Sequence, residues 1–291
     1  MCRVTTIDVA YSTRAVLGEG PTWNPATQRL LWVDILCSEV HEFDPATGVG
    51  TIMPTPQHVG AVKPRAGGGL AVNLVEGVGL YGPAGEFSWL ARWPDPDRRG
   101  NDAAVDPWGH LWAGTMRYDE ADGGGDLRRI APDGTASVVL AGTSVSNGLG
   151  WSPDERTMYF IDSPTRRVDR FDVDPGDGSV RNRRPFVELP DGTPGFPDGM
   201  TVDADGCLWV ALWDGWAVHR YTPDGRLDRV LEMPVARATA CAFGGPDMRD
   251  LYITTARDRL SAQQLAGQPL AGSLLVVHDV GQGAVSKPFA G

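Results

Sequence analysis

The sequence lacks the features of several protein classes. Its 291 residues contain no run of about 18 apolar residues, the length that a membrane-spanning helix needs. The amino terminus, MCRVTTIDVAYSTR, has no apolar core of the kind found in secretion signals. Only 26 Lys and Arg stand against 37 Asp and Glu, which argues against a surface for nucleic acid or for an anionic membrane. We therefore expect neither of these partners, and the composition leaves the oligomeric state open.

Cysteine is also scarce. The four cysteines (Cys2, Cys37, Cys207 and Cys241) lie far apart and have none of the close spacing of zinc or redox motifs. Cys207 and Cys241 fall in strand-like patterns, where a small buried thiol is common. This usage predicts a reduced, cytoplasmic protein.

Helical periodicity is nearly absent, and only residues 259–267 (RLSAQQLAG) resemble a short helix. A parallel α/β fold is excluded because its strands need crossover helices. Short apolar cores recur instead, each preceded by a turn and most followed by an alternating run, as in antiparallel hairpins. The cores are LLWVD (30–34), LAV (70–72), LWAGT (111–115), MYFID (158–162), LWVAL (208–212) and LYITT (251–255).

These cores are regularly spaced. One anchor residue can be matched in each, and successive anchors lie about 39 to 50 residues apart: Trp32, Ala71, Trp112, Tyr159, Trp209 and Tyr252. That spacing suits the four-stranded blade of a propeller, and radial closure protects the strand edges. We predict an all-β, six-bladed β-propeller with a central channel, forming a single domain over residues 1–291. A strand near residues 4–10 should complete the last blade beside LLVVHDV.

Polar residues recur at one position in five of the repeats. About 11 to 13 residues before the anchors stand Glu19, His58, Asn101, Asn147 and Asp198. Inner strands line a propeller's channel, so these side chains should converge near the axis. Gathered carboxylates and amides are costly without a partner, and a divalent cation that prefers oxygen ligands suits Glu19, Asn147 and Asp198.

Other roles remain open at some of these positions. Asp-Gly and Asn-Gly are common turn residues, although Glu19, Asn147 and Asp198 share one phase and each precedes a glycine. Asp198 is expected in a tight Pro-Asp-Gly corner. His58 either binds substrate or forms a hydrogen bond across the channel. In LWDGW, Trp213 and its neighbour Trp216 either pack in the core or wall a sugar pocket.

Four motifs together carry a family resemblance. They are GEGPTW (18–23), NDAAVDPWGHLWAGTM (101–116), SNGLGWSPDERTMYFIDS (146–163) and FPDGMTVDADGCLWVA (196–211). At these residues the chain resembles the gluconolactonase/regucalcin (senescence marker protein) family of sugar lactonases. The resemblance implies a six-bladed propeller with one divalent cation in its channel, either Ca²⁺, Zn²⁺, Mn²⁺, Mg²⁺ or Fe²⁺.

The resemblance also implies roles for single residues. Metal ligands would be Glu19, Asn147 and Asp198, and Asp198 would double as the catalytic base. Arg99, Asn101 and Asp119 would contact the oxygens of the substrate.

The implied reaction is metal-dependent hydrolysis of a sugar aldonolactone to the aldonic acid. The cation would polarise the carbonyl and activate a water molecule whose proton Asp198 takes. No Gly-x-Ser-x-Gly elbow occurs, so serine-esterase chemistry has no candidate nucleophile. The alternatives are a metal-dependent esterase or organophosphate hydrolase on the same scaffold, and a non-catalytic calcium-binding propeller.

Overall fold

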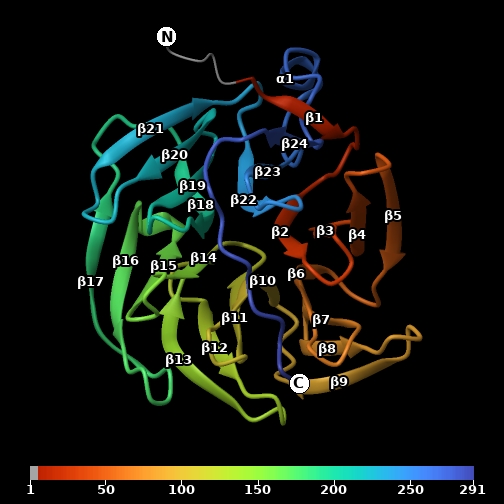
Figure 1. Cartoon of the computed structure of the whole chain (residues 1–291), viewed down its shortest axis with the longest axis vertical. Helices are drawn as coiled ribbons and strands as arrows, with labels where there is room; N and C mark the ends of the chain where they lie inside the picture. The colour runs from red at the N-terminus through yellow and green to blue at the C-terminus, as the bar shows by residue number, and fades with distance from the viewer. Residues whose placement is uncertain (1–5) are drawn as a thin grey trace.

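A ring of six four-stranded antiparallel sheets forms the body of the molecule (Figure 1). The structure is a computed structural model, and it describes residues 6–291. Within that range, helix is limited to a 3₁₀ turn, η1 (Ser163–Thr165), and to α1 (Ala262–Ala266), which lies in the segment predicted to be helical. The predicted six-bladed propeller is confirmed.

Each sheet is one blade, numbered here 1 to 6 in chain order. Blade 1 contains β2 (Gly18–Asn24), β3 (Arg29–Asp34), β4 (Glu39–Asp44) and β5 (Val49–Pro54). Blade 2 contains β6 (Val59–Pro64), β7 (Leu70–Leu74), β8 (Gly77–Tyr81) and β9 (Phe87–Arg92). Blade 3 contains β10 (Arg98–Val105), β11 (Leu111–Arg117), β12 (Gly125–Ile130) and β13 (Ala136–Thr143). Blade 4 contains β14 (Ser146–Trp151), β15 (Thr157–Asp162), β16 (Arg167–Val173) and β17 (Val180–Glu188). Blade 5 contains β18 (Phe196–Val202), β19 (Leu208–Trp213), β20 (Ala217–Tyr221) and β21 (Leu227–Glu232). Blade 6 contains β22 (Ala238–Gly244), β23 (Asp250–Thr255), β24 (Leu274–Val277) and β1 (Asp8–Tyr11).

The ring closes by pairing strands from the two ends of the chain. β1 runs antiparallel to β24, with Asp8 opposite Val276, so an amino-terminal strand completes blade 6 as predicted. The strand begins at Asp8, while positions 4 and 5 of the predicted segment lie outside the described residues.

The six predicted anchors all lie in the second strand of their blades and are buried. The largest of them (Trp32, Trp112 and Trp209) are among the most deeply buried side chains of the protein. Burial of an aromatic side chain of this size contributes strongly to stability, so the anchors hold neighbouring blades together. The described cysteines are free, and Cys207 and Cys241 are buried as expected. No helix in residues 6–291 is long and apolar enough to cross a membrane.

A buried aspartate ties the strands of blade 5 together. Asp203 accepts hydrogen bonds from the backbone N–H of Cys207 (2.8 Å) and from the indole N–H of Trp209 (3.0 Å). Its carboxylate also pairs with Arg220 on the third strand at 2.8 Å. Asp106 makes the equivalent contacts in blade 3. The repeated VDxxGxLW pattern therefore encodes a turn, a strand start and a cross-strand ion pair.

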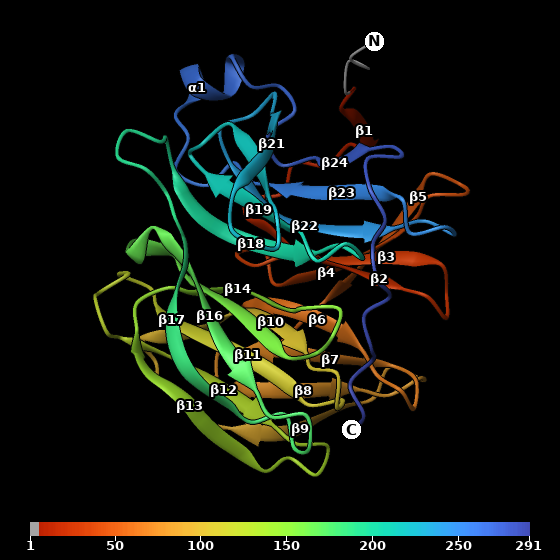
Figure 2. The ribbon, with the colours of Figure 1, turned by 60° about the vertical axis from the view of Figure 1, so that its left-hand side comes forward.

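The carboxyl-terminal segment, residues 281–291, crosses one end of the ring (Figures 1 and 2). It forms bridges from Gly283 to Asp203 in blade 5 and from Phe289 to Arg65 in blade 2. The Phe289 side chain is fully buried, and the N–H of Ala290 donates to the Gly109 carbonyl at 3.0 Å. This segment covers one mouth of the channel and leaves the opposite mouth for a ligand.

Candidate functional site

A cavity of about 370 Å³ opens at the end of the channel where the inner strands begin. Its volume is within the range of small-molecule pockets. The lining includes predicted site residues from four inner strands, together with residues from loops at that mouth: Leu17, Glu19, Arg99, Asn101, Met116, Glu120, Asp122, Val145, Asn147, Ser163, Pro164, Phe196, Asp198, Trp213, Asp214, Asp258 and Arg259. The convergence predicted from the repeat is therefore present.

β-Bulges place the polar side chains in the channel. Pairing between the first and second strands shifts register next to Glu19, Asn147 and Asp198, and again in β10 around Asn101. A bulge turns a side chain out of the regular alternation, which is why such bulges are frequent beside active sites. Asp198 therefore lies within strand β18 and not in the tight Pro-Asp-Gly corner that the sequence suggested.

The glycines after two of these residues allow the inner strands to approach closely. A Cβ atom at Gly148 would lie 2.7 Å from the Asp198 carbonyl oxygen. One at Gly199 would lie 2.3 Å from the Cβ of Ala240 in the next blade. Glycine removes these clashes, so the Asn-Gly and Asp-Gly pairs serve packing around the axis in addition to any turn preference.

Glu19, Asn147 and Asp198 are all buried at the floor of the cavity. The Asn147 amide nitrogen donates to Asp198 and, at 3.1 Å, to the Ser163 hydroxyl, which orients the amide. The Asn147 Oδ1 atom is buried and has no hydrogen-bond partner among residues 6–291. An orphaned buried acceptor of this kind calls for a ligand, because leaving it unsatisfied is costly.

The carboxylates of this group carry an unfavourable concentration of charge. Burial raises the pKa of Glu19 to about 8, and repulsion from Asp102 adds to the shift. Burial raises the pKa of Asp198 well above its usual range, and repulsion from Glu19 is the second cause of this shift. A cation would relieve both the desolvation and the repulsion.

These residues fit a divalent cation. They supply two carboxylates and one free amide oxygen, the donors that hard cations prefer. Within residues 6–291, no group of three His, Cys, Asp or Glu side chains is arranged for a metal ion. The candidate site therefore depends on the asparagine oxygen as its third protein ligand.

Arg99 brings a positive charge into the same cavity. Its guanidinium is buried and donates through Nη1 to Asn101 Oδ1 at 2.6 Å and to the Gly100 carbonyl at 3.0 Å. Both bonds use one nitrogen, so the N–H groups on Nε and Nη2 can serve a ligand. Asn101 also donates to the Ser146 carbonyl at 2.9 Å, and it thereby holds Arg99 in place.

His58 lies beside the cavity but is not among the residues that line it. Its Nδ1 atom is 2.8 Å from the Tyr118 hydroxyl. Burial and the nearby charge of Arg99 lower the pKa of His58. The structure thus supports a hydrogen-bonding role for His58 at the rim.

The predicted contact residue Asp119 is not among the residues that line the cavity. It is exposed and forms an ion pair with Arg117 at 2.8 Å. Its neighbour Glu120 lines the cavity instead. The two tryptophans considered as walls of a sugar pocket differ in position: Trp213 lines the cavity, whereas Trp216 is exposed and is not among the lining residues.

Three residues that act on the site were not predicted from the sequence. Ser163 follows the second strand of blade 4, and its contact with Asn147 depends on the path of the chain through η1. Asp102 and Lys63 do not line this cavity, but the charge of Asp102 raises the pKa of Glu19 and that of Lys63 lowers it. Asp102 directly follows Asn101 in the NDAAVD motif, which was the available clue.

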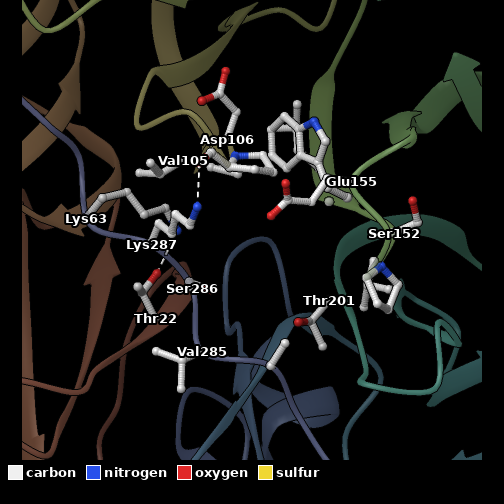
Figure 3. Close-up of a pocket in the computed structure, with 18 of the residues that line it drawn as sticks. Thr22, Lys63, Val105, Asp106, Ser152, Glu155, Thr201, Val285, Ser286 and Lys287 are labelled. Carbon is white, nitrogen blue, oxygen red and sulfur yellow. Dashed lines mark hydrogen bonds between the residues drawn. The ribbon is translucent and has the colours of Figure 1, made fainter. Parts of the chain in front are cut away.

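The opposite end of the channel holds a second cavity of about 220 Å³ (Figure 3). The close-up shows Lys63, hydrogen-bonded to Thr22 at 2.6 Å, near Lys287 of the carboxyl-terminal segment. None of the predicted cation ligands lines this cavity. We therefore place the candidate site at the other mouth.

Comparison with known proteins agrees with this geometry. The model of the SMP-30/gluconolactonase/LRE-like region matches residues 17–257. The chain belongs to this family. The family resemblance proposed from the four motifs is thereby confirmed.

Individual relatives match over most of their length. A 6-deoxy-6-sulfogluconolactonase of Pseudomonas putida is 38% identical over 95% of this chain and 96% of that protein. A pentonolactonase of Haloferax volcanii is 39% identical over 86% of this chain and 85% of that protein. The crystal structure of a calcium-binding protein, regucalcin, from Agrobacterium tumefaciens is 30% identical, covers 98% of this chain and 97% of its own, and superimposes with a TM-score of 0.94.

Proposed function

We propose that this family member is an enzyme that hydrolyses a sugar lactone to the corresponding aldonic acid with the help of one divalent cation. The observation that carries the proposal is the group of two buried carboxylates and an unpartnered amide oxygen beside Arg99. The lactonase names of its relatives support the same reaction class.

The cation would be held by Glu19, Asn147 and Asp198. When bound, it would polarise the lactone carbonyl and lower the pKa of a water molecule. Oxygen ligands alone favour Ca²⁺, Mg²⁺ or Mn²⁺, and the calcium-binding relative supports the first of these.

The side chains divide the remaining work. Asp198 accepts a proton from the attacking water, whose oxygen bonds to the carbonyl carbon. Arg99 donates hydrogen bonds to substrate oxygens before and during the reaction and so orients the lactone, and Asn101 keeps the guanidinium in place. The bond from the carbonyl carbon to the ring oxygen then breaks, and the ring oxygen takes the proton that Asp198 accepted and becomes a hydroxyl group.

The proposal is tested with a panel of substrates in a pH-stat. We expect turnover of neutral five- and six-carbon aldonolactones to exceed that of aryl esters and phosphotriesters. An Asp198→Ala variant, which lacks the base, serves as the blank. Preferred hydrolysis of aryl esters or phosphotriesters would point to an esterase or organophosphate hydrolase, and no turnover of any substrate would leave a non-catalytic binding protein.

A further inference from the structure

Two loops at the open mouth are longer than their counterparts. The connections between second and third strands are short turns in four blades: 35–38, 75–76, 163–166 and 214–216. In blades 3 and 6 the same connections span residues 118–124 and 256–273. Both longer loops contribute side chains to the cavity that holds the candidate cation ligands.

An ion pair joins these two loops. Arg259 Nη2 lies 2.6 Å from Glu120 Oε1, and the guanidinium also lies 3.2 Å from the Asp258 carboxylate. Blades 3 and 6 are opposite each other in a ring of six, since each blade contacts its neighbours in chain order. A contact between their loops must therefore pass over the mouth of the channel.

The conformation of the two loops holds these side chains at the mouth. Both Glu120 and Arg259 have a positive φ (58° and 55°), a conformation that glycine adopts with less strain. Glu120 and Arg99 line the same cavity, where burial lowers the pKa of Arg99 and the charge of Glu120 opposes that shift.

The pair is held weakly enough to open. Arg259 and Glu120 are 61% and 44% exposed, and exposed ion pairs contribute only about 0–1 kcal/mol. Water and salt compete with such a contact, so the mouth can open at little cost.

We propose that the Glu120–Arg259 pair determines which lactones reach the site, by limiting entry and residence to compact monosaccharide lactones and hindering glycosylated ones. The inference rests on the proposed lactonase function and adds the size of the substrate to it. A bulky substituent on the lactone occupies the space of the ion pair, whereas a single ring fits beneath it.

The test compares two substrates that share the reacting ring. One is a monosaccharide aldonolactone and the other is the lactone of a disaccharide aldonic acid. The variants are Glu120→Gln, Arg259→Gln and the double variant. The control is Arg249→Gln, which breaks a similarly exposed pair with Asp279 (2.5 Å) at the other end of the ring.

Each single variant should raise kcat/KM for the disaccharide lactone relative to the monosaccharide lactone by about fivefold. This factor corresponds to the loss of about 1 kcal/mol, the upper contribution of an exposed ion pair. The double variant should gain no more than either single variant, because both remove the same contact. High salt should shift the wild-type ratio in the same direction, and Arg249→Gln should leave it unchanged. An unchanged ratio in the single variants, or an equal loss on both lactones, would overturn the inference.

A second readout does not depend on turnover. Calorimetry with xylitol and with a disaccharide alditol measures access to the same cavity. We expect the single variants to bind the larger alditol about fivefold more tightly relative to xylitol than wild type does. If wild type hydrolyses no lactone, the proposed function fails, and an unchanged binding ratio would separately overturn the role of the ion pair.

Discussion

At the scale of single residues, Asp198 has two roles in the proposed reaction, as a ligand of the cation and as the general base. Replacing it with Asn keeps the shape and one ligand oxygen but removes the base. We expect Asp198→Asn to lower kcat by about 10²-fold or more, the usual contribution of general-base catalysis. Steady-state kinetics measure the loss, and elemental analysis of the variant checks that the cation is retained. Near-native turnover of every lactone would show that Asp198 is only a ligand or a structural residue.

Arg99 should behave differently from Asp198. Arg99 lines the cavity, and its Nε and Nη2 groups can contact the substrate both before and during reaction. Removing such a uniform contact raises KM more than it lowers kcat. We expect Arg99→Ala to show this pattern, with Arg117→Ala at the exposed rim as the matched control. A loss confined to kcat would instead assign Arg99 to the transition state.

The charge of Glu19 predicts a pH dependence of folding. Its pKa is about 8 in the folded chain against an ordinary value of 4.5, so the folded state binds the extra proton between these values. The stability associated with this group is full below about pH 4.5 and falls as the pH rises through about 8. In chelator, Glu19→Gln should therefore lose stability less steeply between pH 5 and pH 9 than wild type does. Urea denaturation at several pH values measures both slopes, and parallel slopes would contradict the assignment.

At the scale of elements, the repeated aspartate stabilises blades 3 and 5. Asp203 is buried and serves the turn, the Trp209 indole and Arg220 together. Asp203→Ala should cost about 3 kcal/mol of unfolding free energy, as expected for breaking a buried pair. The control is Asp228→Ala, which removes the more exposed partner of the same arginine and should cost about 1 kcal/mol or less. Equal losses in urea denaturation would show that the buried network adds nothing.

The strand pattern and the phase of the polar residues could be predicted because both depend on local repetition. Turn, anchor and inner-strand residues recur at fixed offsets, and closure of the ring places equal offsets together. Bulges at Asp198 and its counterparts were not predictable, since a single extra residue in one strand leaves no periodic signal. The loops at the open mouth are not part of the repeat, so neither their conformation nor their contacts could be predicted. The position of Glu120 in the cavity lining and its contact with Arg259 depend on backbone turns far apart in the chain.

At the scale of the whole molecule, the ring divides two tasks between its two mouths. The carboxyl-terminal segment covers one mouth and links blades 2, 3 and 5. The other mouth gathers the candidate ligands from blades 1, 4 and 5 and the guanidinium from blade 3. Residues that are remote in sequence therefore act together only when the ring is closed.

The central claim is that a cation held by Glu19, Asn147 and Asp198 supports lactone hydrolysis. The most direct measurement is the pH-stat rate on a neutral aldonolactone, first with chelator and then with each divalent cation restored. We predict a rate near background in chelator and full recovery with one bound cation per chain, whereas Glu19→Gln with Asn147→Ala recovers little. Undiminished hydrolysis by the chelated wild-type protein would contradict the account.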